Sequence, residues 1–196
     1  MPPTSARPLR ADAERTVRAI LDAAERVLSE HPHATLEQIA EAAGVARTTV
    51  HRRFANREDL VRSMAVAAWR RIAAAVDAAR PLTAPPLVAL HQATANVIEI
   101  KYGASYALDR VDSTDPEVAE LQAAVFANCD AVLARARADG FITADADPTW
   151  VRRVYLALIN ETVHGNAELD GSADPDALAG RVIDTLLSGV GTGRRQ

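Results

Sequence analysis

The segment TLEQIAEAAGVARTTVHRRFANRED, residues 35–59, predicts two short helices joined at Gly44 and a further helix that opens at Asn56. Thr35 precedes the first helix and Gln38 follows three residues later, so the two can cap each other reciprocally as a capping box. The apolar residues of this helix recur at spacings of three and four and form one narrow face: Leu36, Ile39, Ala40 and Ala43.

The corner between the two helices falls on Gly44, because glycine tolerates the positive φ that a tight helix-to-helix turn requires. In the helix that follows, three side chains can point inward and leave the polar residues on the other faces: Val45, Val50 and Phe54. The segment therefore predicts a helix-turn-helix.

The second helix of this motif is locally cationic. No acidic residue occurs from Ala42 to Asn56, and the same window holds Arg47, Arg52 and Arg53, although the formal net charge of the chain is −4. A cationic helix suits the neutralisation of phosphates, so the motif points to DNA.

The first 60 or so residues resemble the DNA-binding domain of the tetracycline-repressor (TetR) family of bacterial transcriptional regulators. The matching segments are ILDAAERVL (20–28), T-x-x-x-I-A-x-x-A-G-V (35–45), V-H-x-x-F (50–54) and N-R-E-D-L (56–60). Two positions depart from the family pattern. Ala46 replaces the usual capping serine, a cap typically worth about 1 kcal/mol, and His51 stands where the family often has tyrosine, which changes the DNA group within reach.

The resemblance implies that the second helix of the motif enters the major groove of double-stranded DNA. The side chains then expected to meet base edges are Arg47, Thr48, Thr49 and His51. Those expected to contact phosphates are Thr35, Arg52, Arg53 and Arg57.

Composition places the chain among soluble globular proteins. Its 196 residues are 48% hydrophobic and 24% charged, which is ordinary for a protein with a sizeable core. No apolar run approaches the roughly 18 to 20 residues of a membrane span, and the N-terminal MPPTSARPLR lacks the apolar core of a signal peptide. One cysteine excludes an intrachain disulfide and fits a reducing compartment. We expect a cytoplasmic protein that does not bind membranes.

Helix signals continue to the end of the chain, and no segment shows sustained alternation of apolar and polar residues, so the expected class is all-α with about nine helices. The first helix should run from Asp12 to Glu30, and Asp-Pro pairs at 115–116, 147–148 and 174–175 should start three later ones. The expected division is a flexible arm (1–11), a DNA-binding domain (12–60), a C-terminal ligand-binding and dimerisation domain (61–190) and a tail (191–196).

In the family, the fourth to eighth helices enclose a ligand pocket. The resemblance thus implies candidate wall residues, for each of which ordinary core packing is the alternative: Trp69, Ile72, Ile98, Tyr102, Tyr106, Phe126, Cys129, Tyr155 and Asn160. Such a mainly apolar wall suits an unknown hydrophobic or amphipathic small molecule. Cys129 lies on the apolar stripe of its helix and is expected to be a buried structural thiol.

The last two helices have two apolar faces each, and both faces must be buried. The family implies that one face covers the core while the other forms a four-helix interface in a homodimer. The candidate interface residues are Leu158, Thr162, Leu178, Val182, Leu186 and Val190. Asn160, Glu161 and His164 are polar groups on an otherwise apolar helix and fit either interface hydrogen bonds or ligand contact.

The resemblance to the TetR family implies a homodimeric repressor that binds a palindromic operator and leaves it when a small molecule occupies the C-terminal core. An activator or a ligand-independent DNA-binding regulator is the nearer alternative. A helical enzyme or ligand-binding protein is the remote one, since Cys129 and His164 are the only conceivable nucleophile and base and have no orienting group. No catalytic residue, metal site or cofactor is expected.

Overall fold

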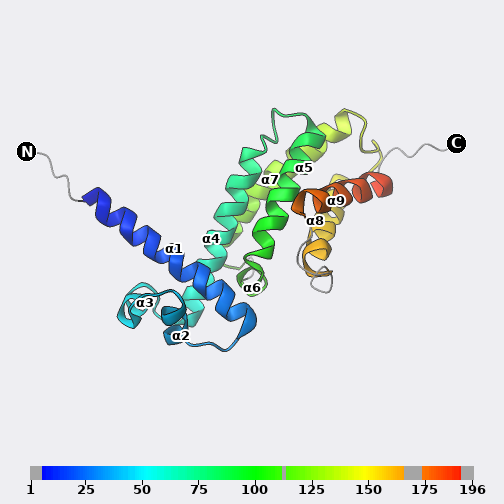
Figure 1. Ribbon diagram of the computed structural model, residues 1–196. Coiled ribbons are helices and arrows are strands. Elements are labelled where there is room, and N and C mark those ends of the chain that lie inside the picture. Colours follow the sequence, from blue (N-terminus) through cyan, green and yellow to red (C-terminus); the bar gives the residue numbers. More distant parts are fainter. Residues whose placement is uncertain (1–5, 112–113, 166–173, 191–196) are drawn as a thin grey trace, which may run out of the picture. The chain divides into compact units, whose positions relative to one another are not determined.

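The computed structural model describes residues 6–111, 114–165 and 174–190, with side chains from Asp12 to Ser188 (Figure 1). These residues form nine α-helices and no strand, which confirms the all-α prediction. The helices are α1 (Ala6–Glu30), α2 (Leu36–Ala42), α3 (Arg47–Arg53), α4 (Arg57–Ala78), α5 (Pro86–Tyr102), α6 (Ser105–Leu108), α7 (Pro116–Ala138), α8 (Pro148–Gly165) and α9 (Pro175–Val190).

Side-chain caps start several of these helices where the sequence predicts them. At α2, the Thr35 hydroxyl accepts from the Gln38 N–H at 3.3 Å, and the Gln38 side chain accepts from the Thr35 N–H at 2.8 Å, which confirms the capping box. At α4, the Asn56 side chain accepts from the N–H of Asp59 at 2.8 Å. The Asp115 carboxylate caps α7 by accepting two backbone N–H bonds.

Helix α1 begins at Ala6, six residues before the expected start at Asp12. Pro8 lies in the first turn of this helix, where its missing N–H has no intrahelical partner to lose. Residues 6–11, which the sequence assigns to a flexible arm, are therefore helical in the structure.

The chain divides into two compact units, and each has its own core. The described residues within 1–67 and 104–112 form unit 1, and those within 68–103 and 113–196 form unit 2. The division falls inside α4 rather than near residue 60, and the short α6 belongs to unit 1.

In unit 1, α1 packs against α2 and α6, and α2 packs against α3; Figure 1 draws α1 and α2 in blue, α3 in cyan and α6 in green. The buried face that the sequence pattern predicts for residues 35–59 lies in this core. The main side chains of the unit 1 core are Ile20, Leu28, Ile39, Val50, Phe54 and Leu60.

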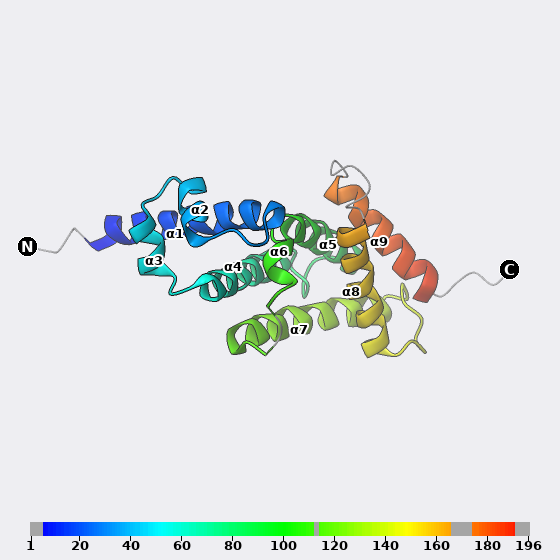
Figure 2. The same cartoon turned by 90° about the horizontal axis from the view of Figure 1, so that it is seen from below.

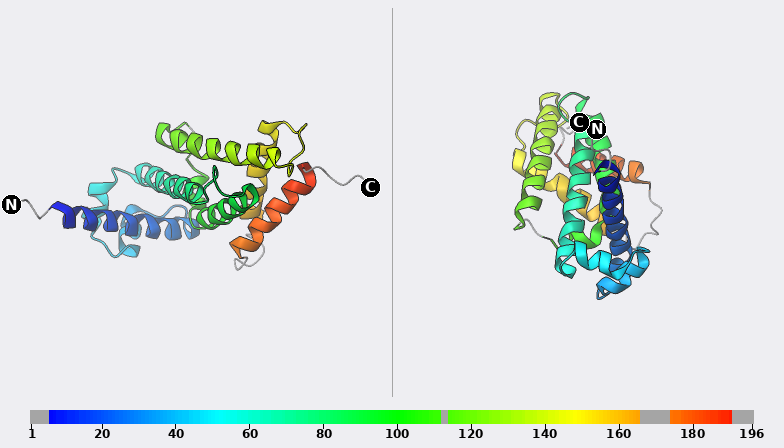
Figure 3. Two further views of the ribbon diagram at one scale, coloured as in Figure 1. Left: turned by 90° about the horizontal axis from the view of Figure 1, so that it is seen from above. Right: turned by 90° about the vertical axis from the view of Figure 1, so that its left-hand side faces the viewer.

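In unit 2, α5 is the central helix and packs against α7, α8 and α9. Figure 2 shows α8 and α9 side by side, and the left view of Figure 3 shows α9 lying against α5. The core side chains include Leu90, Ile98, Val132, Tyr155, Ile159, Leu178, Val182 and Leu186. Within the described part of the chain, no helix has the length and apolar character needed to cross a membrane.

Candidate nucleic-acid interface and cavity

The corner between α2 and α3 positions the candidate interface. Gly44 has a φ of 66°, the left-handed conformation expected at this position. Beside it, the N–H of Val45 donates to the Ala40 carbonyl at 3.0 Å. Val50 and Phe54 are buried in the core of unit 1. Because these two side chains anchor one face of α3, the opposite face points to solvent.

The outward face of α3 carries the residues that the sequence assigns to DNA. Thr49 is half-buried, and the others are exposed: Arg47, Thr48, His51, Arg52 and Arg53. At the start of the helix, Ala46 is the N-cap and makes no side-chain capping bond, as its methyl group predicts. This surface offers guanidinium and hydroxyl donors in a form that can enter a groove of DNA.

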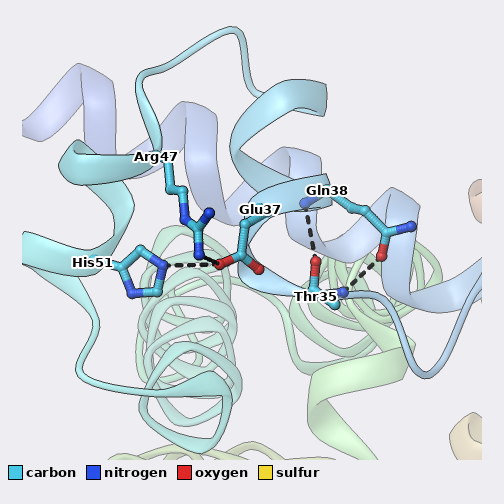
Figure 4. Close-up of polar contacts among 5 residues, drawn as sticks. All are labelled: Thr35, Glu37, Gln38, Arg47 and His51. Carbon is cyan, nitrogen blue, oxygen red and sulfur yellow. Dashed lines mark hydrogen bonds and ion pairs between the residues drawn. The ribbon is translucent and has the colours of Figure 1, made fainter.

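A carboxylate from α2 meets this face. One oxygen of Glu37, Oε1, lies 2.5 Å from a terminal guanidinium nitrogen of Arg47 and 3.3 Å from Nε2 of His51 (Figure 4). A hydrogen bond from its own backbone N–H, with weaker contributions from Thr35, His51 and Arg47, lowers the pKa of the Glu37 carboxyl below its usual range. Glu37 is therefore an anion at neutral pH, next to two of the expected base readers.

Arg57 points into unit 1. Its guanidinium donates to the Pro32 carbonyl and to the Tyr106 hydroxyl, and Tyr106 in turn donates to Pro32 at 3.3 Å. The guanidinium of Arg110 stacks 3.8 Å from the centre of the Tyr106 ring. The backbone N–H of Tyr106 donates to Glu25 of α1 at 2.8 Å. These contacts attach α6 to α1 and to the start of α4.

Unit 2 contains a cavity of about 270 Å³. Its wall comes from α4, α5, α7 and α8 and from Pro81, and it is mainly aliphatic and aromatic. The lining residues are Trp69, Ile72, Val76, Pro81, Ala89, Leu90, Ala93, Val97, Lys101, Gln122, Val125, Phe126, Asn128, Cys129, Val132, Tyr155, Leu156, Ile159 and Asn160.

Two polar groups of this wall are satisfied within the protein. The Tyr155 hydroxyl is hydrogen-bonded to that of Thr94 at 2.7 Å, and burial raises the pKa of Tyr155. Asn128 donates its amide to Asp77 at 2.8 Å. Burial also raises the pKa of the Cys129 thiol to about 12, so it is protonated at neutral pH. The thiol is thus a structural group, as its place on an apolar stripe predicts.

Comparison with known proteins places the chain in a family. Residues 20–64 match the family model of bacterial regulatory proteins of the tetR family. The chain is 37% identical over 147 residues to the HTH-type transcriptional repressor LfrR of Mycolicibacterium smegmatis, an alignment that covers 74% of this chain and 76% of LfrR. The chain belongs to the tetR family. This TetR-family protein is a DNA-binding transcriptional regulator and not an enzyme.

Solved structures of TetR-family regulators have the same fold. LfrR from Mycobacterium smegmatis in complex with proflavine superposes with a TM-score of 0.67 at 33% identity, over 92% of this chain and 98% of LfrR. FadR from Bacillus subtilis in complex with stearoyl-CoA gives a TM-score of 0.72 at 22% identity, over 88% of this chain and 98% of FadR. At that lower identity, the similarity to FadR concerns the fold alone.

The TetR-family resemblance implies nine cavity residues, and the structure brings six of them together. Trp69, Ile72, Phe126, Cys129, Tyr155 and Asn160 line the cavity. Ile98 lies in the core of unit 2, and Tyr102 donates its hydroxyl to the Thr162 carbonyl at 3.1 Å. Tyr106 belongs to unit 1. An aromatic side chain outside the DNA motif is therefore an incomplete guide to the cavity, because its helix also has faces that pack elsewhere.

Sequence reasoning missed two of the amide groups and the small residues of this TetR-family cavity. Gln122 and Asn128 line it from α7, and Ala93 lines it from α5. The available signal was their spacing: Gln122 precedes Phe126 by four residues and Cys129 by seven, which places all three on one side of a helix.

On the surface of unit 2, a groove of about 260 Å³ lies between α8 and α9. The expected interface residues Leu158 and Thr162 line it and are partly exposed. Leu178 and Val182 also line it but are almost wholly buried within the chain, and Leu186 is fully buried. The reason is that α9 uses this stripe against α5. The side chain of Val190 lies outside the described residues.

Proposed function

We propose that this protein is a repressor that binds a palindromic operator as a homodimer through α3, and that a small molecule in the unit 2 cavity releases it. The observation that carries the proposal is the exposed face of α3, which presents Arg47, Thr48 and His51 beside Arg52 and Arg53. Repression rather than activation is supported by the 37% identity to LfrR, which is named a transcriptional repressor.

The exposed residues suggest how α3 divides its contacts. Arg47, Thr48 and His51, with the half-buried Thr49, are proposed to read base edges, and Arg52 and Arg53 are proposed to neutralise phosphates. Arg57 has a different role in this proposal, because its guanidinium donates to Pro32 and Tyr106 and holds the domain together. Thr35 caps α2 and fixes the helix that lies behind α3.

The lining of the cavity favours a ligand that is aromatic or otherwise apolar and has few polar groups. Trp69 and Phe126 offer flat apolar surfaces, and the side chains of Gln122 and Asn160 supply hydrogen-bonding groups. Lys101 is the one charged side chain among the described lining residues, and no carboxylate is present there. The LfrR complex with proflavine is a precedent in a relative for a small aromatic molecule.

Helix α4 is the proposed connection between ligand and DNA. Its residues Trp69, Ile72 and Val76 line the cavity, and only three residues separate its first residue from the end of α3. Ligand binding is proposed to favour a state in which the two α3 helices of the dimer no longer match successive major grooves, about 34 to 36 Å apart. Moving such an equilibrium from 1:99 to 99:1 requires roughly 5.5 kcal/mol of differential affinity.

A mobility-shift assay tests the DNA-binding half of the proposal. The probes are DNA from upstream of the coding sequence and duplexes selected from a random pool, at about 150 mM salt with competitor DNA. Wild-type protein should give a specific shift that Arg47→Ala abolishes. Arg26→Ala removes an exposed arginine from α1 of the same unit and is the matched control, which should retain the shift. Absence of any sequence preference in the selection would refute operator binding.

A cavity-filling variant tests the ligand half. Ala93→Phe places a phenyl group in the cavity wall and should weaken binding of a ligand such as proflavine by at least roughly tenfold, while the operator shift is retained. Ala127→Phe, at an exposed position of α7, is the control and should bind ligand as the wild type does. If ligand at saturation never altered operator affinity in the wild type, release by ligand would be disproved.

A further inference from the structure

Glu37 contacts Arg47 and His51, the first and last of the candidate base-reading residues of α3. A single carboxylate oxygen lies 2.5 Å from the Arg47 guanidinium and 3.3 Å from the His51 imidazole (Figure 4). The three side chains are partly or largely exposed, with 37% exposure for Glu37, 68% for Arg47 and 43% for His51. The cluster thus forms part of the surface that DNA would meet.

The sequence around the cluster makes this carboxylate unusual. No acidic residue occurs from Ala42 to Asn56, so α3 and its flanks supply no anion of their own. Glu37 comes from α2, and its lowered pKa keeps it charged through the physiological range. An anion on this face is repelled by phosphates and competes with them for the same guanidinium.

The contact leaves most of Arg47 available. A guanidinium has five N–H donors in a planar fork, and Glu37 engages one terminal nitrogen. The other donors can still meet the O6 and N7 acceptors of a guanine while the ion pair remains in place. A phosphate on unrelated DNA, by contrast, approaches Arg47 only against the charge of Glu37.

We propose that Glu37 is a specificity-determining residue, which holds Arg47 and His51 against indiscriminate phosphate contact and orients Arg47 toward base edges. This inference rests on the proposed contact between α3 and DNA. Its consequence is that neutralising Glu37 strengthens binding to unrelated DNA more than binding to the operator.

The test compares Glu37→Gln with Glu41→Gln by fluorescence anisotropy on two 30-base-pair duplexes, one of random sequence and one selected from a random pool by the wild-type protein. Both substitutions remove one negative charge from α2, but Glu41 is exposed and, within the described residues, makes none of the contacts that Glu37 makes with α3. Long-range electrostatics therefore change equally in the two variants.

Glu37→Gln should tighten binding to the random duplex by roughly threefold or more, while operator affinity changes less, so the specificity ratio falls. Glu41→Gln should leave that ratio unchanged. The effect of Glu37→Gln should also disappear in a chain that carries Arg47→Ala and His51→Ala. Without DNA, the guanidinium NMR signals of Arg47 should move in Glu37→Gln and stay in place in Glu41→Gln.

Equal specificity ratios in the two single variants would overturn the inference, and so would an effect that persists without Arg47 and His51. A loss of affinity for both duplexes in Glu37→Gln would assign Glu37 to helix stability instead. Wild-type protein that bound the two duplexes equally would refute operator recognition itself, and the inference would fall with it.

Discussion

Burial decides the chemistry of the one thiol in the chain. Cys129 lies in the wall of the cavity, and its pKa is raised to about 12, so thiolate is rare at neutral pH. We expect iodoacetamide to alkylate Cys129 in the folded protein at pH 7.5 at least roughly a hundredfold more slowly than in urea. Mass spectrometry over time measures both rates. Similar rates would mean that the cavity wall opens readily.

Arg80 is the one described residue other than glycine with a positive φ, at 52°. It lies between α4 and α5, where its carbonyl accepts from the N–H groups of Thr83 and Ala84 at 3.0 Å. A left-handed conformation costs a residue with Cβ about 1 kcal/mol. Arg80→Gly should therefore raise the melting temperature by a few degrees.

The control for Arg80→Gly is Arg71→Gly, at an exposed site inside α4. That change should destabilise the protein by about 1 kcal/mol, because glycine is a poor helix former. Calorimetry compares the melting temperatures of the two variants, one with glycine at a left-handed position and one with glycine inside a helix. A lower melting temperature for both would contradict the strain at Arg80.

At the scale of elements, one carboxylate of α1, that of Glu25, accepts a hydrogen bond from the backbone N–H of Tyr106 in α6. Burial raises the pKa of Glu25, more than the hydrogen bonds from Tyr106 and Ala107 lower it. The folded chain then keeps this proton at pH values where the unfolded chain has lost it. The contribution of Glu25 to the free energy of unfolding therefore falls as pH rises from its ordinary value, 4.5, through the raised value.

Urea unfolding from pH 4 to 7 checks this for wild type and Glu25→Gln. We expect the wild type minus variant difference in unfolding free energy to decline with pH across that interval and to level off above it. Glu30→Gln, an exposed site at the end of the same helix, should show no such trend. A flat difference for Glu25→Gln would mean that α6 does not bury this carboxyl in solution.

At the scale of the whole molecule, the groove between α8 and α9 is where we expect a second copy to dock. Thr162 and Arg181 both line it. Thr162→Arg adds bulk and a like charge beside Arg181, so sedimentation should show the chain changing from dimer to monomer. Operator affinity should then fall by roughly a hundredfold or more, because paired binding is lost.

Ala124→Arg, on the exposed surface of α7, is the matched control and should remain dimeric. A Thr162→Arg variant that sedimented as the wild type does would move the interface away from this groove.

The local pattern was sufficient wherever neighbours in the chain supply the interactions. The capping box at Thr35, the corner at Gly44 and the outward face of α3 all depend on residues a few positions apart, so spacing and residue type predicted them. The family resemblance also came from such short segments. The expected start at Asp12 left out residues 6–11 of α1, although the first turn of a helix tolerates proline.

Contacts between residues far apart in the sequence were decided by tertiary packing, because residue spacing does not predict them. Tyr106 joins the core of unit 1 and Arg57 turns inward to meet it, because residues 49 positions apart come together only in the folded chain. Leu178, Val182 and Leu186 form an apolar stripe, and the sequence alone does not tell whether that stripe packs against α5 or against a second copy. The structure shows that it packs against α5. The pairing of Glu37 with Arg47 and His51 likewise required the angle between α2 and α3, which is set by the buried side chains beneath them.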